Sequence, residues 1–249
     1  MLFGHGTHTR AAMSHAESLG RRAFVLGWIP ALLGAELAGV SFRVMRHGHS
    51  PHRFLVIHGD EDTARDVLTF WMKEHDGDAC IVTGTERNVA IRGMKIDPNR
   101  MFSRLGAERS LRSLNPGADP EKITGALNFL DKHRAELLKR VIPPKGSRLL
   151  ALHNNREYSV QDEVAASDET SIKQPRTPRS FFLCTNPADY AVLKGSPFNT
   201  VLQTKPEPDD GSLSRLAARR GFRYVNLECA IGDYDGQLER VRWLEANLP

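Results

Sequence analysis

A histidine and a glutamate that could share one metal ion follow a short apolar stretch of the chain. Residues 54–57 are all apolar and predict a buried strand; His58 follows at once, and Glu61 comes three residues later. The loop after a strand lies at the rim of a sheet, where α/β proteins place ligand sites. Imidazole nitrogen and carboxylate oxygen are both zinc ligands, and a catalytic zinc keeps three protein ligands and a water. Because this spacing is common by chance, an ordinary polar loop is the alternative.

Two further residues of this kind follow apolar stretches later in the chain. His153 comes directly after residues 149–152, and Glu228 after residues 224–227. Polar groups that end separate strands can meet at one edge of a sheet, so we expect them to join His58 and Glu61. Taken singly, His153 could be a buried histidine bonded to a backbone carbonyl, and Glu228 a paired core carboxylate.

A tight turn between these segments carries an amide and a guanidinium side by side. It reads Asp97-Pro98-Asn99-Arg100-Met101-Phe102. A guanidinium fork matches the geometry of a carboxylate, which predicts a carboxylate site at Asn99 and Arg100. The simpler interpretation is a turn alone, for which aspartate, proline and asparagine are well suited.

The ordered set of these residues resembles the zinc carboxypeptidase superfamily, most closely the branch that contains aspartoacylase and succinylglutamate desuccinylase. In this chain the set reads His58-x-x-Glu61, Arg92, Asp97-x-Asn99-Arg100-x-Phe102, His153 and Glu228. The resemblance covers about residues 54–245. It implies that His58, Glu61 and His153 bind Zn²⁺, which lowers the pKa of its bound water toward ~7.

The resemblance also implies the remaining roles. Glu228 would be the general base that takes a proton from the water and hands it to the leaving amine. Arg92 would polarise the scissile carbonyl and stabilise the oxyanion. Asn99 and Arg100 would hold a substrate carboxylate. The reaction implied is hydrolysis of an amide bond next to a carboxylate.

The sequence departs from the family in the region that would set specificity. The chain is shorter than a digestive carboxypeptidase, and two asparagines follow His153. The family's active-site tyrosine has two candidates, Tyr158 and Tyr224. The predicted lining of the specificity pocket comprises Asn155, Gln203, Asp210 and Ser212, and Tyr158 is also predicted to bind substrate.

Alternating strand and helix patterns predict an α/β fold: one domain over residues 50–249, with a mixed central sheet and helices on both faces. Predicted strands cover residues 54–57, 79–83, 148–152, 180–184, 199–203 and 223–227, with a further one at 85–91; predicted helices cover residues 63–75, 119–140, 212–220 and 237–246. Residues 160–180 are polar and contain two prolines, which indicates a long surface loop or lid.

Residues 1–45 differ from the remainder and predict an N-terminal extension. Arg21 and Arg22 precede an apolar stretch over residues 23–35, an arrangement that resembles a twin-arginine export signal. Pro30 and Glu36 interrupt this stretch, so no stable membrane span is expected. The alternative is an amphipathic helix packed on the domain. With an export signal the protein would be periplasmic or secreted, and otherwise cytoplasmic. Met13 is an alternative start.

Composition narrows the range of partners. The 249 residues are 40% hydrophobic and 26% charged with a net charge of +4, which is typical of a globular protein. Basic residues are not interleaved with aromatic ones, so no nucleic-acid partner is expected. Arg215, Arg219, Arg220 and Arg223 are interpreted as a solvated helix face, with a nucleic-acid or anion patch as the alternative. No Gly-rich phosphate loop follows a strand.

The cysteines do not offer a competing site. Cys80, Cys184 and Cys229 lack the spacing of a metal site, and their odd number argues against a disulfide framework. Cys229 stands next to Glu228, but no histidine lies nearby in sequence to activate it as a nucleophile.

Two function classes therefore stay open. The first is a zinc-dependent amide hydrolase, either a carboxypeptidase or an N-acyl amino acid deacylase, whose substrate is a small molecule or short peptide with a free carboxylate. The second is a non-catalytic module that binds carboxylate ligands on the same fold. The presence of all four residues His58, Glu61, His153 and Glu228 favours the enzyme.

Overall fold

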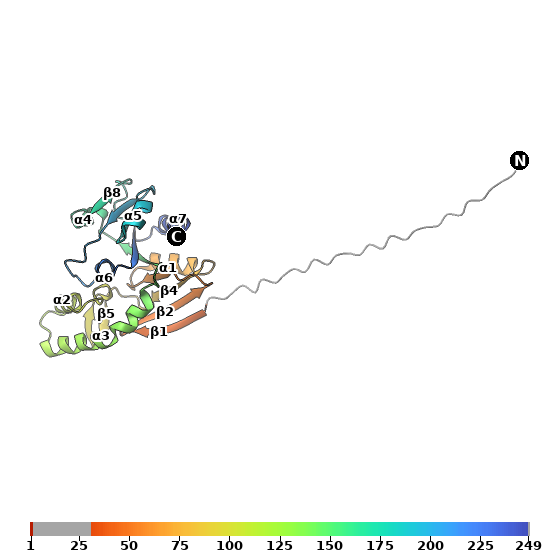
Figure 1. Cartoon of the computed structure of the whole chain (residues 1–249). Coiled ribbons are helices and arrows are strands. Elements are labelled where there is room, and N and C mark those ends of the chain that lie inside the picture. The colour runs from red at the N-terminus through yellow and green to blue at the C-terminus, as the bar shows by residue number, and fades with distance from the viewer. Residues whose placement is uncertain (2–30, 249) are drawn as a thin grey trace.

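A nine-stranded sheet runs through the computed structural model, which describes Met1 and residues 31–248 (Figure 1). A separate hairpin pairs β5 (Val89–Ile91) with β6 (Met94–Ile96). In spatial order the nine strands are β1 (Ala31–Leu37), β2 (Val40–His47), β4 (Gly77–Val82), β3 (Arg53–Val56), β7 (Arg148–Asn155), β11 (Arg223–Ala230), β9 (Phe181–Cys184), β10 (Asn199–Leu202) and β8 (Glu169–Ser171).

The sheet is mixed, as the sequence predicted. The central strands β4, β3, β7 and β11 pair in parallel, and so do β9 and β10. Antiparallel pairing joins β1 to β2, β2 to β4, β11 to β9 and β10 to β8. The parallel centre places the C-terminal ends of β3, β7 and β11 at one edge of the sheet.

Helices cover both faces of the sheet, which confirms the predicted fold class. One face packs against α1 (Asp62–Trp71), α5 (Pro187–Leu193) and α7 (Tyr234–Asn247); the other packs against α2 (Arg104–Leu114), α3 (Pro120–Val141) and α6 (Leu213–Arg220). The α4 helix (Val160–Val164) and the 3-10 turn η1 (Pro98–Arg100) are short.

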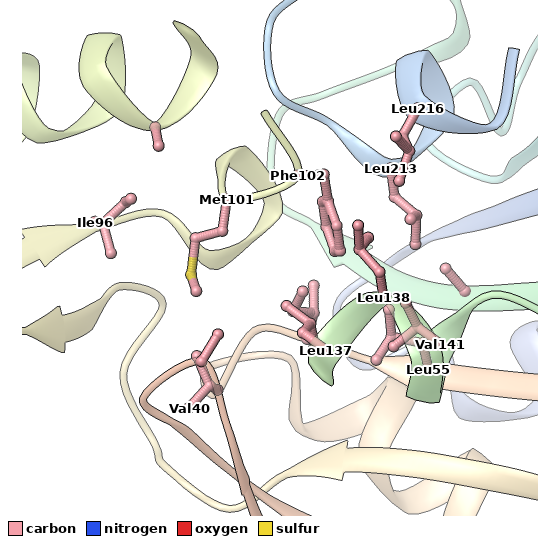
Figure 2. Packing of buried hydrophobic residues seen from close by; sticks show 14 of the residues in the cluster. Val40, Leu55, Ile96, Met101, Phe102, Leu137, Leu138, Val141, Leu213 and Leu216 are labelled. Atoms are coloured by element: carbon pink, nitrogen blue, oxygen red, sulfur yellow. The ribbon is translucent and has the colours of Figure 1, made fainter. Parts of the chain in front are cut away.

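Side-chain alternation divides the core between these two layers. In β7, Leu150 and Leu152 join the α1/α7 layer, whereas Leu149 and Ala151 join the α3/α6 layer. Figure 2 shows the second layer, where residues of α3 lie beside Leu55 of β3 and residues of α6 lie near Phe102. His153 and Glu228 have the parity of this second layer.

Local sequence explains where the main helices begin and end. Asp119 caps α3 by accepting from the backbone N–H of Glu121, and Pro120 is the first helical residue. Gly221 ends α6 with φ of 69°, a left-handed conformation that a residue without a Cβ adopts easily.

The folded domain begins earlier than the predicted boundary between residues 45 and 50. Residues 31–47 form β1 and β2, and β2 pairs with β4 along the sheet. Val40 and Phe42 of β2 are buried in the core. The apolar stretch that resembled an export signal therefore continues into a sheet strand. Most of that stretch and the arginine pair lie outside the described residues, so export stays a prediction.

Other differences concern elements that the sequence patterns did not separate. The predicted loop over residues 160–180 contains α4 and the edge strand β8. The α2 and α5 helices were not predicted, and α5 begins at a proline that follows an asparagine cap. Among the described residues, no helix is both long and apolar enough to cross a bilayer.

Candidate metal and active site

The connection between β3 and α1 presents two of the predicted ligands. The strand ends at Val56 and the helix begins at Asp62, so His58 and Glu61 lie on a five-residue link. His153 lies inside β7 near its C-terminal end rather than after the strand. All three side chains are buried, with 2–4% of their surface exposed.

The three side chains converge on Glu61. Its Oε1 lies 2.8 Å from His58 Nδ1, and its Oε2 lies 3.1 Å from His153 Nδ1. The two imidazole rings are 5.2 Å apart between centroids. One ligand atom from each residue falls within 4.8 Å of the other two, which is the compactness of a single coordination sphere.

Asp97 fixes the orientation of the first histidine. His58 Nε2 lies 2.9 Å from Asp97 Oδ1, while Nδ1 faces Glu61. A carboxylate on the far nitrogen of a ligating imidazole holds the ring and leaves the near nitrogen for the metal. Asp97 is itself oriented by η1, because its Oδ1 accepts from the backbone N–H of Asn99.

These contacts shift three pKa values in the metal-free protein. Burial alone would lower the pKa of His58, but the charge of Glu61 and the hydrogen bonds that the imidazole donates to Asp97 and Glu61 raise it to about 9. Burial alone would raise the pKa of Glu61, but His153 and His58 lower it to about 2. Burial alone would raise the pKa of Asp97, but the hydrogen bond and charge of His58, the backbone N–H of Asn99 and the charge of Arg100 together lower it to about 2.

The residues fit a divalent metal ion such as zinc. Two imidazole nitrogens and one carboxylate are a donor set that zinc accepts. Glu61 Oε2 is buried and has no hydrogen-bond donor of good geometry among the described residues, although His153 is near. A buried carboxylate oxygen without a donor is costly, and coordination to a cation would satisfy it.

Glu228 lies beside His153 on the neighbouring strand. β7 and β11 pair in parallel, and His153 is the register partner of Glu228. The Glu228 carboxylate accepts from Asn155 Nδ2 at 3.0 Å on one oxygen and from Asn226 Nδ2 at 3.2 Å on the other. Both donors are neutral amides, so they hold the carboxylate in place without a counter-charge.

A cleft of about 480 Å³ opens on this side of the sheet and contains all four residues. Every predicted substrate-binding residue also lines it: Asn99, Arg100, Asn155, Tyr158, Gln203, Asp210 and Ser212. Arg100 Nη1 donates to Asp210 Oδ2 at 3.1 Å, and Asn99 Oδ1 accepts from the backbone of Leu213. The turn and the residues before α6 thus form one wall.

The opposite wall comes from the segment around α4. Tyr158 and Gln203 both donate to the carboxylate of Glu163, another cleft residue. Burial raises the pKa of Tyr158, and the neighbouring charge of Glu163 raises it further. Tyr224, the other tyrosine candidate, is 2% exposed in the core and does not line the cleft.

Arg92 is not among the residues that line the cleft, so the structure does not bring it to the metal ligands, and its catalytic role stays a prediction. It occupies the turn between β5 and β6 with φ of 53°, and its guanidinium lies 5.9 Å from the Phe129 ring centroid. Arg87 enters the cleft instead, with Nη1 3.4 Å from Glu61 Oε1. The turn backbone points Arg92 toward α3, which residue spacing does not reveal.

Two more cleft residues were missed from sequence. Arg215 was assigned to a solvated face, but only 8% of it is exposed and it lines the cleft. Glu163 lay in the predicted loop, where no pattern distinguished it. The single clue to Arg215 is its place three residues after Ser212, which caps α6 and faces the same cleft.

A network of buried amides supports the strand that carries His153. Gln237 Nε2 donates to the carbonyl oxygen of His153 at 3.1 Å, and Asn154 Nδ2 donates to Gln237 Oε1 at 3.1 Å. Asn154 Oδ1 accepts from the backbone N–H of Ala64 at 2.7 Å. This network ties β7 to α1 and α7.

Comparisons with known proteins do not assign the metal site. No protein-family model matches the chain, and no curated protein sequence matches it. Among solved structures, a succinylglutamate desuccinylase/aspartoacylase from Rhodobacter sphaeroides is similar, with a TM-score of 0.40 and 13% identity. The match covers 84% of this chain and 59% of that protein. This likeness is too distant to carry an argument about activity.

Proposed function

We propose that this protein is a zinc-dependent hydrolase that cleaves an amide bond next to a carboxylate. The observation that supports it most is the convergence of His58, Glu61 and His153, with Glu228 on the adjacent strand in the same cleft. A non-catalytic module would need the carboxylate site but not a general base beside the metal ligands.

The predicted metal ligands and Glu228 would have different roles in this reaction. His58, Glu61 and His153 would hold zinc, which supplies Lewis acidity and a water of lowered pKa when bound. Glu228 accepts a proton from the attacking water and delivers it to the nitrogen of the leaving amine. Asn155 and Asn226 keep its carboxylate aimed during both transfers.

Two arginines supply the positive charge that such a substrate needs. Arg100 and Asn99 bind the substrate carboxylate, and Asp210 holds Arg100 in position. Arg87 is half-exposed beside Glu61, where its guanidinium stabilises the negative oxygen that develops on the scissile carbonyl.

The test is amine release from N-acyl amino acids and short peptides by the zinc-loaded protein and its Glu228→Gln variant. The variant should retain zinc, because Glu228 is not a ligand, and should lose about 10²–10⁴-fold in kcat, the usual contribution of a general base. Glu157→Gln, an exposed change outside the cleft, is the matched control. A wild-type protein that binds these compounds without hydrolysing any would identify the non-catalytic module instead.

A further inference from the structure

A buried cation without a counter-charge lies in the cleft. Arg215 is 8% exposed and lines the cleft, yet no carboxylate of the described residues comes within 4.0 Å of its guanidinium. Its Nη1 donates to the backbone carbonyl of Lys205 at 2.8 Å. Arg219, one turn further along α6, pairs with Asp209 as an ordinary surface arginine does. Burial of an unpaired charge is costly unless a ligand compensates it.

A carboxylate in the same cleft lacks a cation. Glu163 is half-buried, and its two oxygens accept from Tyr158 Oη and Gln203 Nε2. No lysine, arginine or histidine of the described chain forms an ion pair with it. The two neutral donors fix the carboxylate while leaving its negative charge uncompensated.

The two uncompensated charges are anchored to one short segment. Glu163 is bonded to Gln203 and Arg215 to Lys205, residues that are about 7 Å apart in an extended chain. They form no ion pair with each other. A ligand group that carries an ammonium and a carboxylate a few ångströms apart would neutralise both.

We infer that this subsite binds a zwitterionic amino-acid end group on the acyl side of the substrate. The ammonium contacts Glu163 and the carboxylate contacts Arg215. This inference rests on the proposed function, in which Arg100 and Asn99 hold the carboxylate on the other side of the scissile bond. The substrate class is then an amide formed by the side-chain carboxyl of an acidic amino acid, such as a γ-glutamyl amide.

Three matched compounds separate the two charges. γ-Glutamyl-glycine carries both groups, glutaryl-glycine lacks the ammonium, and 4-aminobutyryl-glycine lacks the acyl-side carboxylate. Their dissociation constants are measured by calorimetry on the zinc-loaded Glu228→Gln protein, which does not consume them. γ-Glutamyl-glycine should bind at least about tenfold more tightly than either analogue, the usual effect of one charged hydrogen bond.

Variants assign each charge to its partner. Adding Glu163→Gln should abolish the preference over glutaryl-glycine alone, and Arg215→Gln the preference over 4-aminobutyryl-glycine alone. Arg215→Lys keeps the positive charge and should retain part of that preference. It replaces Arg215→Gln as the test if the glutamine variant does not fold. Arg219→Gln and Glu157→Gln are controls outside the cleft and should change neither preference.

The outcomes distinguish this inference from the proposed function. Equal binding of the three compounds, absence of γ-glutamyl-glycine binding, or an equal loss for all three in Arg215→Gln would overturn the zwitterion subsite. If the wild-type protein hydrolyses glycine amides without any preference among the three, only the subsite is wrong. If the preferences hold but nothing is hydrolysed, the subsite stands and the hydrolase proposal fails.

Discussion

At the scale of single residues, the cleft depends on which guanidinium stands beside the metal ligands. Residue order pointed to Arg92, but the structure places Arg87 against Glu61 and Arg92 over the Phe129 ring. The two arginines therefore form a natural pair for mutation.

Arg87→Ala should lower kcat/KM by about 10²–10³-fold, the usual loss when one donor to a developing oxyanion is removed. Arg92→Ala should leave kcat/KM within about threefold, because Arg92 does not line the cleft. Steady-state kinetics on one cleaved amide compares them. The assignment of Arg87 is wrong if Arg92→Ala is the more damaging change.

The raised pKa of His58 makes the stability of the metal-free protein depend on pH. A group whose pKa is higher in the folded state stabilises the fold below its unfolded value of 6.5, and this contribution is lost as pH rises through about 9. The unfolding free energy should therefore fall by on the order of 2–3 kcal/mol between pH 6.5 and 9. Urea unfolding with a chelator present measures it.

His58→Gln is the control for this pH dependence and should flatten it. At the acid end the sign reverses for Glu61, whose lowered pKa stabilises the fold above pH 4.5 and ceases to do so as pH falls through about 2. An unfolding free energy that rises between pH 6.5 and 9 would contradict the contacts of His58.

At the scale of elements, the position of His153 depends on how β7 is held between α1 and α7. Gln237 is fully buried and bonds to the carbonyl of His153 and to the amide of Asn154. Gln237→Leu leaves both partners unpaired, which should cost about 1–3 kcal/mol of stability. Zinc affinity should fall as well, because β7 carries a ligand.

Gln161→Leu removes an exposed glutamine and serves as the control. Chemical denaturation and zinc titration with a competing chelator provide the two measurements. Unchanged zinc affinity in a folded Gln237→Leu variant would show that the network supports the fold without positioning the ligand.

Elements with a strong local pattern could be predicted from sequence, and so could the site residues that lie at their ends. His58 and Glu61 could be predicted because they come shortly after an apolar strand. His153 and Glu228 could be predicted because they lie near the ends of apolar strands in the same sheet. Arg215 could not be predicted, because helix periodicity shows on which face of the helix a residue lies but not what packs against that face. The positive φ that directs Arg92 away from the cleft could not be predicted from residue types either.

At the scale of the whole molecule, the sheet extends two strands beyond the predicted domain. The apolar residues near the N-terminus suited an export signal, and only pairing with β4, more than thirty residues away, makes β2 part of the core. Long-range strand pairing of this kind leaves no local trace in composition.

Phe42→Ala tests this boundary. Phe42 is 1% exposed in β2, and its truncation should cost about 3–5 kcal/mol of stability. Phe70→Ala removes a phenyl ring that is 42% exposed and should cost far less. Denaturant unfolding of the two variants measures both losses of stability. Equal stabilities would mean that β1 and β2 do not belong to the domain.

Zinc occupancy is the measurement that tests the proposed metal site most sharply. The protein should bind one zinc ion per chain, and anomalous diffraction at the zinc edge should place it between His58 Nδ1, His153 Nδ1 and the carboxylate of Glu61. His58→Ala and His153→Ala should each abolish stoichiometric binding. A protein that binds no zinc, or binds it at other residues, would show that His58, Glu61 and His153 do not form a zinc site.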